Sequence, residues 1–210
     1  MLTVCEFFIV AEDYICREGY QDEIKWAENI KPLEEQTAGN FFLEYVWVVL
    51  NARMREQVAR KIYERYIEDF NPRVVKHPKK QAAIIEGMEH YETWFANLKA
   101  ADDKLAYLDT LPFIGTVLAQ HLARNMGVNT VKHDVHMVRV ADAYGYSSPS
   151  ELALDIQSVF QKTRLGVIDL IIWRFCNLVG SEKYLRVIHG SFGETDWIYH
   201  SSPEGVKDHG

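Results

Sequence analysis

The chain has 210 residues, 48% of them hydrophobic, and a net charge of −7 at pH 7. A chain of this size can bury one core, or two small lobes that share a core, without disulfides or metals to hold it. Its three cysteines, Cys5, Cys16 and Cys176, are far apart and form no CxxC pair. This spacing excludes a disulfide framework, a clustered zinc site and an iron–sulfur cluster, and it favours a reducing, cytosolic compartment.

The opening residues, MLTVCEFFIVAEDYIC, are apolar but do not have the pattern of a signal peptide. No basic residue precedes the apolar patch, and Glu6, Glu12 and Asp13 interrupt it. No apolar run in the sequence reaches membrane-spanning length. We therefore expect a soluble protein without a membrane partner, in the cytoplasm or associated with the nucleoid.

Charge is distributed unevenly along the chain. Residues 1–50 hold ten acidic and three basic side chains, whereas residues 53–80 hold nine basic and four acidic ones. A local excess of positive charge can form a face for phosphates even when the whole protein is acidic. The same pattern also fits an ordinary solvated helix face followed by a basic loop, and both interpretations stay open.

Helical periodicity recurs along the chain, and the alternation typical of strands is nearly absent, so we predict an all-α fold. The first predicted helix is buried and is capped by Gly39-Asn40, and Ser148 to Glu151 form a capping box before a later helix. The last predicted helix stops at Gly180, and the tail beyond His189 is expected to be irregular. The predicted helices cover residues 41–50, 54–70, 78–97, 98–109, 116–126, 134–144, 149–160 and 165–179.

A five-residue connection, Leu111-Pro112-Phe113-Ile114-Gly115, lies between two of these helices. Its length predicts an αα-hairpin whose second helix starts near Thr116 and ends at Gly127. The unpaired N–H groups at such a helix start form an anion site that suits a DNA phosphate. On the inward face of this helix we expect Val117, Leu118, Leu122 and Met126.

The loop VNTVKH then brings Asp134 to the start of the next helix, where the helix dipole favours the ionised carboxylate. A carboxylate in such a place can stabilise the positive charge that develops on a sugar when an N-glycosidic bond breaks, and it can orient the attacking water. The base must first leave the stack and enter a pocket. The alternative role of Asp134 is that of a helix N-cap alone.

The segment LPFIG…GVNTVKHDVHMVRVA resembles the helix-hairpin-helix superfamily of base-excision DNA glycosylases, which includes the endonuclease III and alkyl-adenine glycosylase types. That family carries a Leu-Pro-Gly-hydrophobic-Gly hairpin and, about twenty residues later, a Val-Asp-x-His-hydrophobic-x-Arg-Val string. Here Asp134 lies nineteen residues after Gly115, and DVHMVRV matches in register. The strong match covers about 35 residues, and a weaker one extends over about 41–180.

The resemblance implies a two-lobed helical fold in which residues 1–210 form one glycosylase-like domain. Its hairpin motif would cover about 105–127, and its catalytic loop and helix about 128–145. The implied partner is double-stranded DNA with a flipped base, bound by a monomer without a cofactor.

Four departures from the family pattern carry information. Family members that also cut the strand use a lysine where this chain has Val117, so the resemblance implies a monofunctional enzyme that leaves an abasic site. Phe113 replaces the first hairpin glycine, although its Cβ disfavours the positive φ of that turn. Asn51-Ala52-Arg53 stands where the family has Gln-Thr-x, and the cysteines of the family's iron–sulfur cluster are missing.

From these patterns we assign three sets of candidate residues. The catalytic candidates are Asp134 with Lys132 and His136, although the sequence favours a structural hydrogen bond over a role as a base for His136. Any aromatic candidate for the base pocket is also suited to core packing. The DNA-binding candidates are Phe113, Gly115, Thr116, Val117, Asn51, Arg53, Arg55 and Arg139, with Arg60 and Lys61 as further backbone contacts, and the base-pocket candidates are Tyr45, Trp47, Tyr144 and Trp173.

Other interpretations use the same residues. His133-Asp134, with His90 or His121 and Asp169, resembles the donor set of an HD-type metal phosphohydrolase. The altered hairpin and Lys132-His133 also fit bacteriophage enzymes of the glycosylase fold that transfer groups onto a modified thymine without excising it. A third alternative is a module that only binds DNA or another protein.

Overall fold

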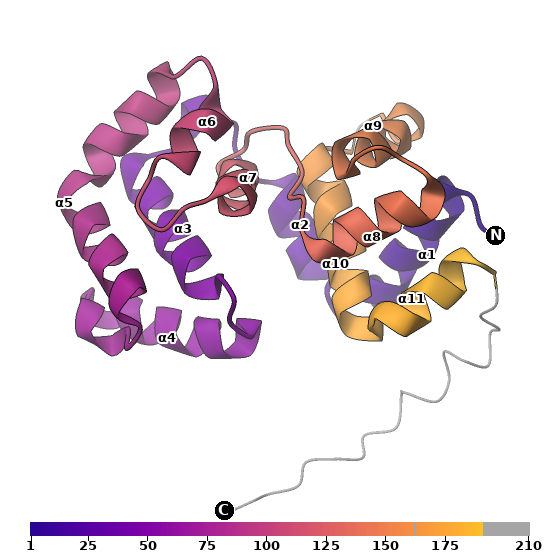
Figure 1. Ribbon diagram of the computed structural model, residues 1–210, viewed down its shortest axis with the longest axis horizontal. Helices are drawn as coiled ribbons and strands as arrows, with labels where there is room; N and C mark the ends of the chain where they lie inside the picture. Colours follow the sequence, from indigo (N-terminus) through magenta and orange to yellow (C-terminus); the bar gives the residue numbers. More distant parts are fainter. Residues whose placement is uncertain (162, 191–210) are drawn as a thin grey trace, which may run out of the picture.

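The computed structural model describes residues 1–161 and 163–190, and these residues form an all-helical fold without a strand (Figure 1). The prediction of an all-α protein is thus confirmed. In the same residue ranges, no helix combines the length and the apolar character that crossing a membrane requires. The tail that was expected to be irregular lies, from residue 191 on, outside the described residues.

The helices follow one another with short connections. The α-helices are α1 (Val4–Arg17), α2 (Gln21–Glu28), α3 (Ala38–Asn51), α4 (Glu56–Asp69), α5 (Pro78–Ala100), α6 (Lys104–Asp109), α7 (Thr116–Asn125), α8 (Val135–Tyr144), α9 (Pro149–Val159), α10 (Leu165–Val179) and α11 (Ser181–Ile188), and the 3₁₀ turns are η1 (Leu33–Glu35) and η2 (Pro72–Val74).

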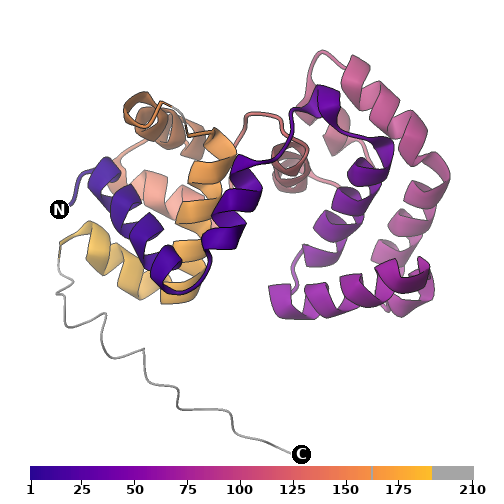
Figure 2. The same ribbon diagram turned by 180° about the vertical axis from the view of Figure 1, so that it is seen from behind.

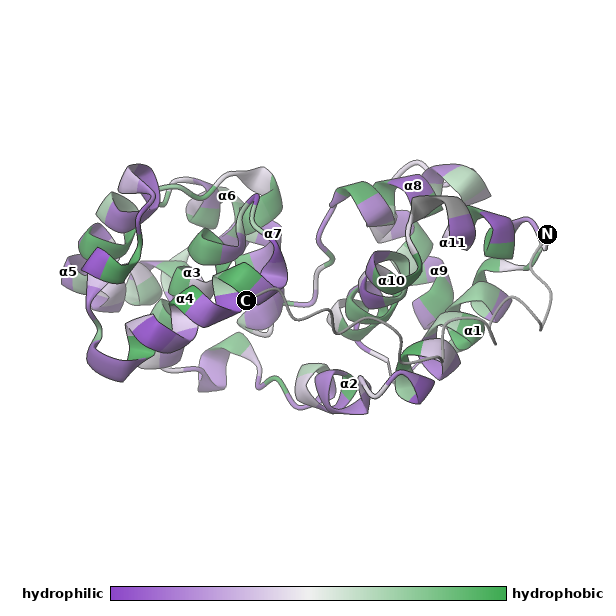
Figure 3. Ribbon diagram, turned by 90° about the horizontal axis from the view of Figure 1, so that it is seen from below, coloured by the Kyte–Doolittle hydropathy of each residue, from purple (hydrophilic) through white to green (hydrophobic). Residues whose placement is uncertain are grey.

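The helices surround two hydrophobic clusters (Figures 1 and 2). A first helix group, α1, α2 and α8 to α11, encloses one cluster, and a second helix group, α3 to α7, encloses the other. The chain therefore starts in the first group, crosses to the second after α2 and returns after α7. In both groups hydrophobic and hydrophilic residues alternate around the helices, as expected for helices that bury one face (Figure 3).

The two connections between the helix groups contact each other. Gly127 has a φ of 85°, and a Cβ at this position would lie 2.1 Å from the carbonyl oxygen of Lys31. Arg164 donates to the carbonyl oxygens of Ile30 at 2.5 Å and Gly127 at 2.9 Å. A residue other than glycine at 127 would force these two segments apart.

The apolar opening of the sequence is the buried face of α1, a helix that the sequence analysis did not assign. Thr3 and Glu6 form a capping box at its start. Phe7, Phe8 and Ala11 follow on one face at helical spacing and are buried. The acidic residues that interrupt the patch therefore belong to the outer face of an amphipathic helix.

Several predicted boundaries were wrong. Thr37 caps α3 in place of Gly39-Asn40, because its hydroxyl accepts the Asn40 N–H at 3.1 Å. Helix α5 continues to Ala100 instead of ending at residue 97, so the helix predicted over 98–109 is shortened to α6, Lys104–Asp109. Helix α10 is not the last one, since Gly180, with a φ of 78°, turns the chain directly into α11.

Other boundaries agree with the sequence prediction. Helix α7 begins at Thr116, and α9 begins with Pro149 after Ser148, whose hydroxyl accepts the Glu151 N–H. The box is modified, since Glu151 accepts from the backbone and hydroxyl of Ser147. Asp134 is the N-cap of α8. These caps place the segments that carry the candidate site.

Candidate functional site

The hairpin between α6 and α7 is held by a buried tyrosine. The Tyr45 hydroxyl donates to the carbonyl oxygen of Pro112 at 2.7 Å and lies 3.2 Å from that of Ala83. Tyr45 itself is fully buried in the second cluster, and its burial raises its pKa. A residue proposed for the base pocket thus fixes the hairpin to α3 and α5 from inside the core.

Phe113 adopts a φ of 65°, a left-handed conformation that favours glycine. For a residue with a Cβ this costs about 1–2 kcal/mol. The ring packs against the second cluster, with the His77 ring 6.0 Å away and the Lys80 ammonium 5.9 Å from its centroid. Packing therefore offsets the strain that the sequence departure introduces.

The start of α7 is open to solvent. Gly115, Thr116 and Val117 are exposed, and no side chain caps the helix. The N–H groups of its first turn are therefore accessible to an anion. The exposure of Val117 contradicts its predicted inward position. Leu118 is partly buried against the second cluster, and Leu122 and Met126 are buried, as predicted.

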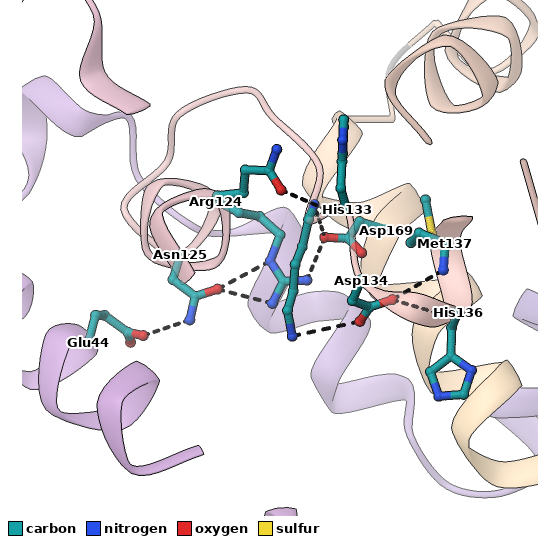
Figure 4. A network of polar contacts seen from close by, with 10 residues as sticks. Glu44, Arg124, Asn125, His133, Asp134, His136, Met137 and Asp169 are labelled. Atoms are coloured by element: carbon teal, nitrogen blue, oxygen red, sulfur yellow. Dashed lines mark hydrogen bonds and ion pairs between the residues drawn. The ribbon is translucent and has the colours of Figure 1, made fainter. Parts of the chain in front are cut away.

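The two oxygens of the Asp134 carboxylate have different contacts (Figure 4). Its Oδ1 accepts hydrogen bonds from the backbone N–H groups of His136 at 3.0 Å and Met137 at 3.1 Å. Its Oδ2 lies 3.7 Å from the Lys132 ammonium, and 12% of the side chain is exposed. One oxygen is thus fixed by the helix, and the other faces a cation.

The loop before Asp134 is held by two side chains from other helices. Oδ2 of Asp169 on α10 accepts the Lys132 N–H at 3.0 Å and a guanidinium N–H of Arg124 at 2.7 Å. The Gln120 side-chain oxygen accepts the His133 N–H at 2.8 Å. Arg124 approaches α10 closely, because a Cβ on Gly166 would lie 2.9 Å from its Cγ. The position of Asp134 therefore depends on α7 and α10.

Burial changes the titration of the groups around Asp134. It lowers the pKa of Lys132, which Asp134 partly opposes, and it lowers the pKa of His136 and His133. Burial also raises the pKa of Asp169, and Arg124 opposes this shift. The cluster thus combines a weakly exposed amine with neutral imidazoles.

The remaining candidates of this region have different surroundings. Nδ1 of His136 is buried and has no hydrogen-bond partner among the described residues, while its ring lies 6.1 Å from that of Tyr184. Nε2 of His133 lies 2.8 Å from the Ser150 hydroxyl. Arg139 is exposed on α8. His136 is placed within the cluster, whereas Arg139 is at the surface.

The other predicted DNA contacts lie at the corner between α3 and α4. Asn51 is half-buried, and Arg53 and Arg55 are exposed; Arg53 has a φ of 52°. Arg60 is engaged within the protein, since it donates to Glu56 at 2.9 Å and lies over the Trp47 ring. Of these arginines, Arg53 and Arg55 are the ones without a described ion pair.

A cavity of about 400 Å³, here called the central cavity, is lined by both helix groups. It brings together two predicted base-pocket residues, Trp47 on α3 and Trp173 on α10. Tyr45 and Tyr144 do not line it, because Tyr45 is in the core and Tyr144 packs beside Phe7 of α1. Asp134 does not line it either, but Arg124 does, and Arg124 contacts the Asp169 that holds the loop before Asp134.

Sequence reasoning missed most of the polar residues of this cavity. Glu44 accepts from the Asn125 amide at 2.8 Å, and the Asn125 side-chain oxygen accepts from Arg124 at 3.2 Å (Figure 4). His121 was considered only as a metal ligand, and so was Asp169, which does not line the cavity but pairs with Arg124. The signal in the sequence was the spacing of His121, Arg124 and Asn125 along one face of α7.

The donor set of an HD-type phosphohydrolase is not assembled in the described residues. Within residues 1–161 and 163–190, no group of three or more histidine, cysteine, aspartate or glutamate side chains could hold a metal ion. His133 instead bonds to Ser150, and Asp169 pairs with Arg124. The metal-hydrolase alternative therefore has no site in this part of the chain.

Comparison with known proteins adds a viral relative. No family model and no solved structure matches the chain. It is 33% identical over 92 residues to suppressor of silencing 2b of cucumber mosaic virus (strain Q), a match that covers 43% of this chain and 90% of the viral protein. Over those residues the chain belongs to the family of that suppressor. More than half of the chain lies outside the match.

Proposed function

We propose that the protein is a monofunctional DNA glycosylase that cleaves the N-glycosidic bond of a flipped, modified base. The observation that carries this proposal is the geometry of Asp134: the helix holds Oδ1, while Oδ2 stays on the side of Lys132 and is not capped. A carboxylate fixed in this way can face a sugar without further reorganisation, which is what electrostatic stabilisation of a cationic transition state requires.

The reaction breaks the bond between C1′ of the sugar and the base nitrogen, and the electron pair leaves with the base. The developing charge on the sugar is stabilised by Asp134, and a water oxygen bonds to C1′. Its proton passes to the Asp134 carboxylate. The Lys132 ammonium lies 3.7 Å from Oδ2, on the side of the carboxylate that the helix does not cap. The exposed Val117 stands where the strand-cutting members of the helix-hairpin-helix glycosylases have a lysine, so the DNA strand stays intact.

In this proposal the two helix groups are the two lobes of a helix-hairpin-helix glycosylase fold. The exposed first turn of α7, at Gly115 to Val117, binds a phosphate. The central cavity receives the flipped base between Trp47 and Trp173. The enzyme acts as a monomer on DNA of the cytoplasm or nucleoid.

The test is a panel of duplexes with different modified bases, in which heat or alkali reveals abasic sites. Asp134→Asn keeps an acceptor for the α8 N–H groups, because asparagine caps a helix as well as aspartate does. We expect this variant to bind duplex DNA like the wild type but to release the base at least about 100-fold more slowly. Asp103→Asn, a change in the N-cap of α6, is the matched control and should release the base normally.

The result can overturn the proposal in two ways. Equal release by the wild type and Asp134→Asn would remove Asp134 from the mechanism. A base that becomes heavier but stays on the sugar would instead indicate the transferase chemistry of the phage enzymes. Mass spectrometry of the digested duplex separates these products from excision.

A second candidate function is suppression of silencing, and the match to the cucumber mosaic virus suppressor favours it. In cells that carry a silenced reporter, a protein with this function restores reporter expression. Asp134→Asn should restore it as well as the wild type, since no bond to a base has to be cleaved. Persistent silencing in the presence of folded, expressed protein would exclude this candidate.

A further inference from the structure

The central cavity contains a buried imidazole without a partner. His121 on α7 lines the cavity, is 5% exposed, and makes no hydrogen bond among the described residues. Its pKa lies well below 6.5, because it is buried and Arg124 and Lys132 are near. The ring is therefore neutral at pH 7 and offers one N–H donor and one acceptor. The ring nitrogens reach the open space of the cavity, where a polar ligand can bond to them.

Two more polar groups lie beside His121. Arg124 and Asn125 follow it by three and four residues on the same face of α7, and Glu44 contacts Asn125. The Asn125 amide occupies one oxygen of Glu44, which leaves Oε1 as an acceptor. Arg124 uses three of its five N–H groups, on Asp169 and Asn125, and keeps two. The cavity thus offers donors from α7 and a carboxylate acceptor from α3.

The charges of the cavity argue against an ionic ligand. Each arginine that lines it is already paired: Arg60 with Glu56, Arg124 with Asp169, and Arg174 with Glu23 and Glu56, which disfavours a phosphate.

A cationic ring would compete with the protein's own cations. The guanidinium of Arg60 lies 5.5 Å from the Trp47 centroid, and that of Arg174 lies 4.7 Å from the Trp173 centroid. A neutral heterocycle needs no unpaired arginine and does not compete as a cation for the tryptophan rings. Trp26 and Tyr63 add further aromatic surface, and the volume of about 400 Å³ leaves room for a planar base.

We propose that the central cavity binds a neutral pyrimidine of the uracil type, in which a ring N–H lies between two carbonyl groups. Glu44 accepts the ring N–H, and His121 and Arg124 donate to the carbonyl oxygens. Cytosine has a nitrogen lone pair at the position of this N–H, so it would face the Glu44 oxygen without a hydrogen bond. The inference rests on the proposed function for the choice of a nucleobase as ligand.

Binding of free bases tests this inference without any bond cleavage. Uracil, cytosine and N3-methyluracil are titrated into the full protein, and the fluorescence of the tryptophans that line the cavity is followed. We expect uracil to bind at least tenfold more tightly than cytosine or N3-methyluracil. Equal binding of the three bases, or no binding of uracil up to its solubility, overturns the inference.

Glu44→Gln gives the sharper outcome. The glutamine oxygen is required by the Asn125 amide, so its NH₂ group faces the cavity and should reverse the preference from uracil to cytosine. His121→Phe keeps a ring of similar shape and should weaken uracil binding at least tenfold. Glu34→Gln, at an exposed site, is the matched control and should bind as the wild type does. Unchanged selectivity in both cavity variants overturns the inference.

The duplex experiment tests the proposed glycosylase activity, and the free-base experiment tests the proposed ligand, so either proposal can be rejected without the other. Loss of base release in every duplex with intact uracil selectivity would reject the glycosylase and keep the ligand class. Base release without uracil selectivity would keep the glycosylase and reject the ligand class.

Discussion

The Asp169 carboxylate accepts a hydrogen bond from the backbone amide of Lys132, 37 residues earlier in the chain, at 3.0 Å. The same oxygen binds Arg124, whose side chain is only 9% exposed. Asp169 is therefore the point at which α7, α10 and the loop before Asp134 meet.

This relationship predicts a large cost for Asp169→Leu. The change leaves the Arg124 guanidinium buried without a charge partner, which should destabilise the protein by about 3–5 kcal/mol. Urea unfolding followed by circular dichroism measures the change. The double variant Arg124→Leu, Asp169→Leu removes both charges and should recover at least about 1 kcal/mol of the loss. A double variant that is less stable than Asp169→Leu would show that the pair is not the source of the cost.

Arg174 is predicted to hold α10 to one helix of each group, α2 and α4. It donates to Glu23 on α2 at 2.7 and 2.8 Å and to Glu56 on α4 at 3.0 and 3.2 Å, and its side chain is 7% exposed. Arg174→Met should cost about 2 kcal/mol, less than a fully buried pair, because both carboxylates stay partly hydrated.

The control for this change is Arg65→Met, at an exposed position of α4. It should cost less than about 0.5 kcal/mol in the same urea experiment. Equal costs for the two arginines would contradict the structural role of Arg174.

Local signals in the sequence predicted the caps and the hairpin, but not the contacts between helices. Asp134 was placed at the start of α8 because capping depends on neighbouring residues. Glu44 and Asn125 are 81 residues apart, and Arg124 and Asp169 are 45 apart, so no local pattern joins them. Tyr45 was assigned to a pocket and lies in the core, since an aromatic residue on a helix gives no sign of which neighbour covers it.

Phe113 allows a test of backbone strain that is independent of function. Phe113→Gly and Phe113→Ala lose the same ring contacts with His77 and Lys80. Only alanine keeps a Cβ at the φ of 65°, so the glycine variant should be more stable by about 1 kcal/mol. Thermal unfolding of the two variants measures the difference. An alanine variant as stable as the glycine variant would mean that the hairpin relaxes out of this conformation.

Arg53 and Arg55 predict the salt dependence of DNA binding. Both are exposed at the α3–α4 corner, and each contact with a phosphate releases about one counterion. Replacing both by alanine should weaken duplex binding on every sequence and reduce the slope of log K against log salt by about 2. Arg17→Ala, exposed on α1, is the control. An unchanged slope in the double variant would place the DNA elsewhere.

The buried histidines predict that stability falls in mild acid. Burial lowers the pKa of His121 well below 6.5, and it also lowers the pKa of His133 and His136. Above the unfolded pKa of about 6.5 all three are neutral in both states, so they give no pH dependence. Below it the unfolded chain takes up protons that the folded protein refuses, so the free energy of unfolding decreases as the pH falls, by up to about 1.4 kcal/mol per pH unit for each histidine.

His121→Phe removes one of these groups without opening a large void. Urea unfolding at pH 7 and pH 5 should therefore show a smaller loss of stability in the variant than in the wild type. Because His121 is the most buried of the three, its share of the loss should extend to the lowest pH, where His133 and His136 already take up protons in the folded state. Parallel pH profiles for the two proteins would mean that His121 takes up its proton in the folded state, and that the cavity around it is more open to water than its burial indicates.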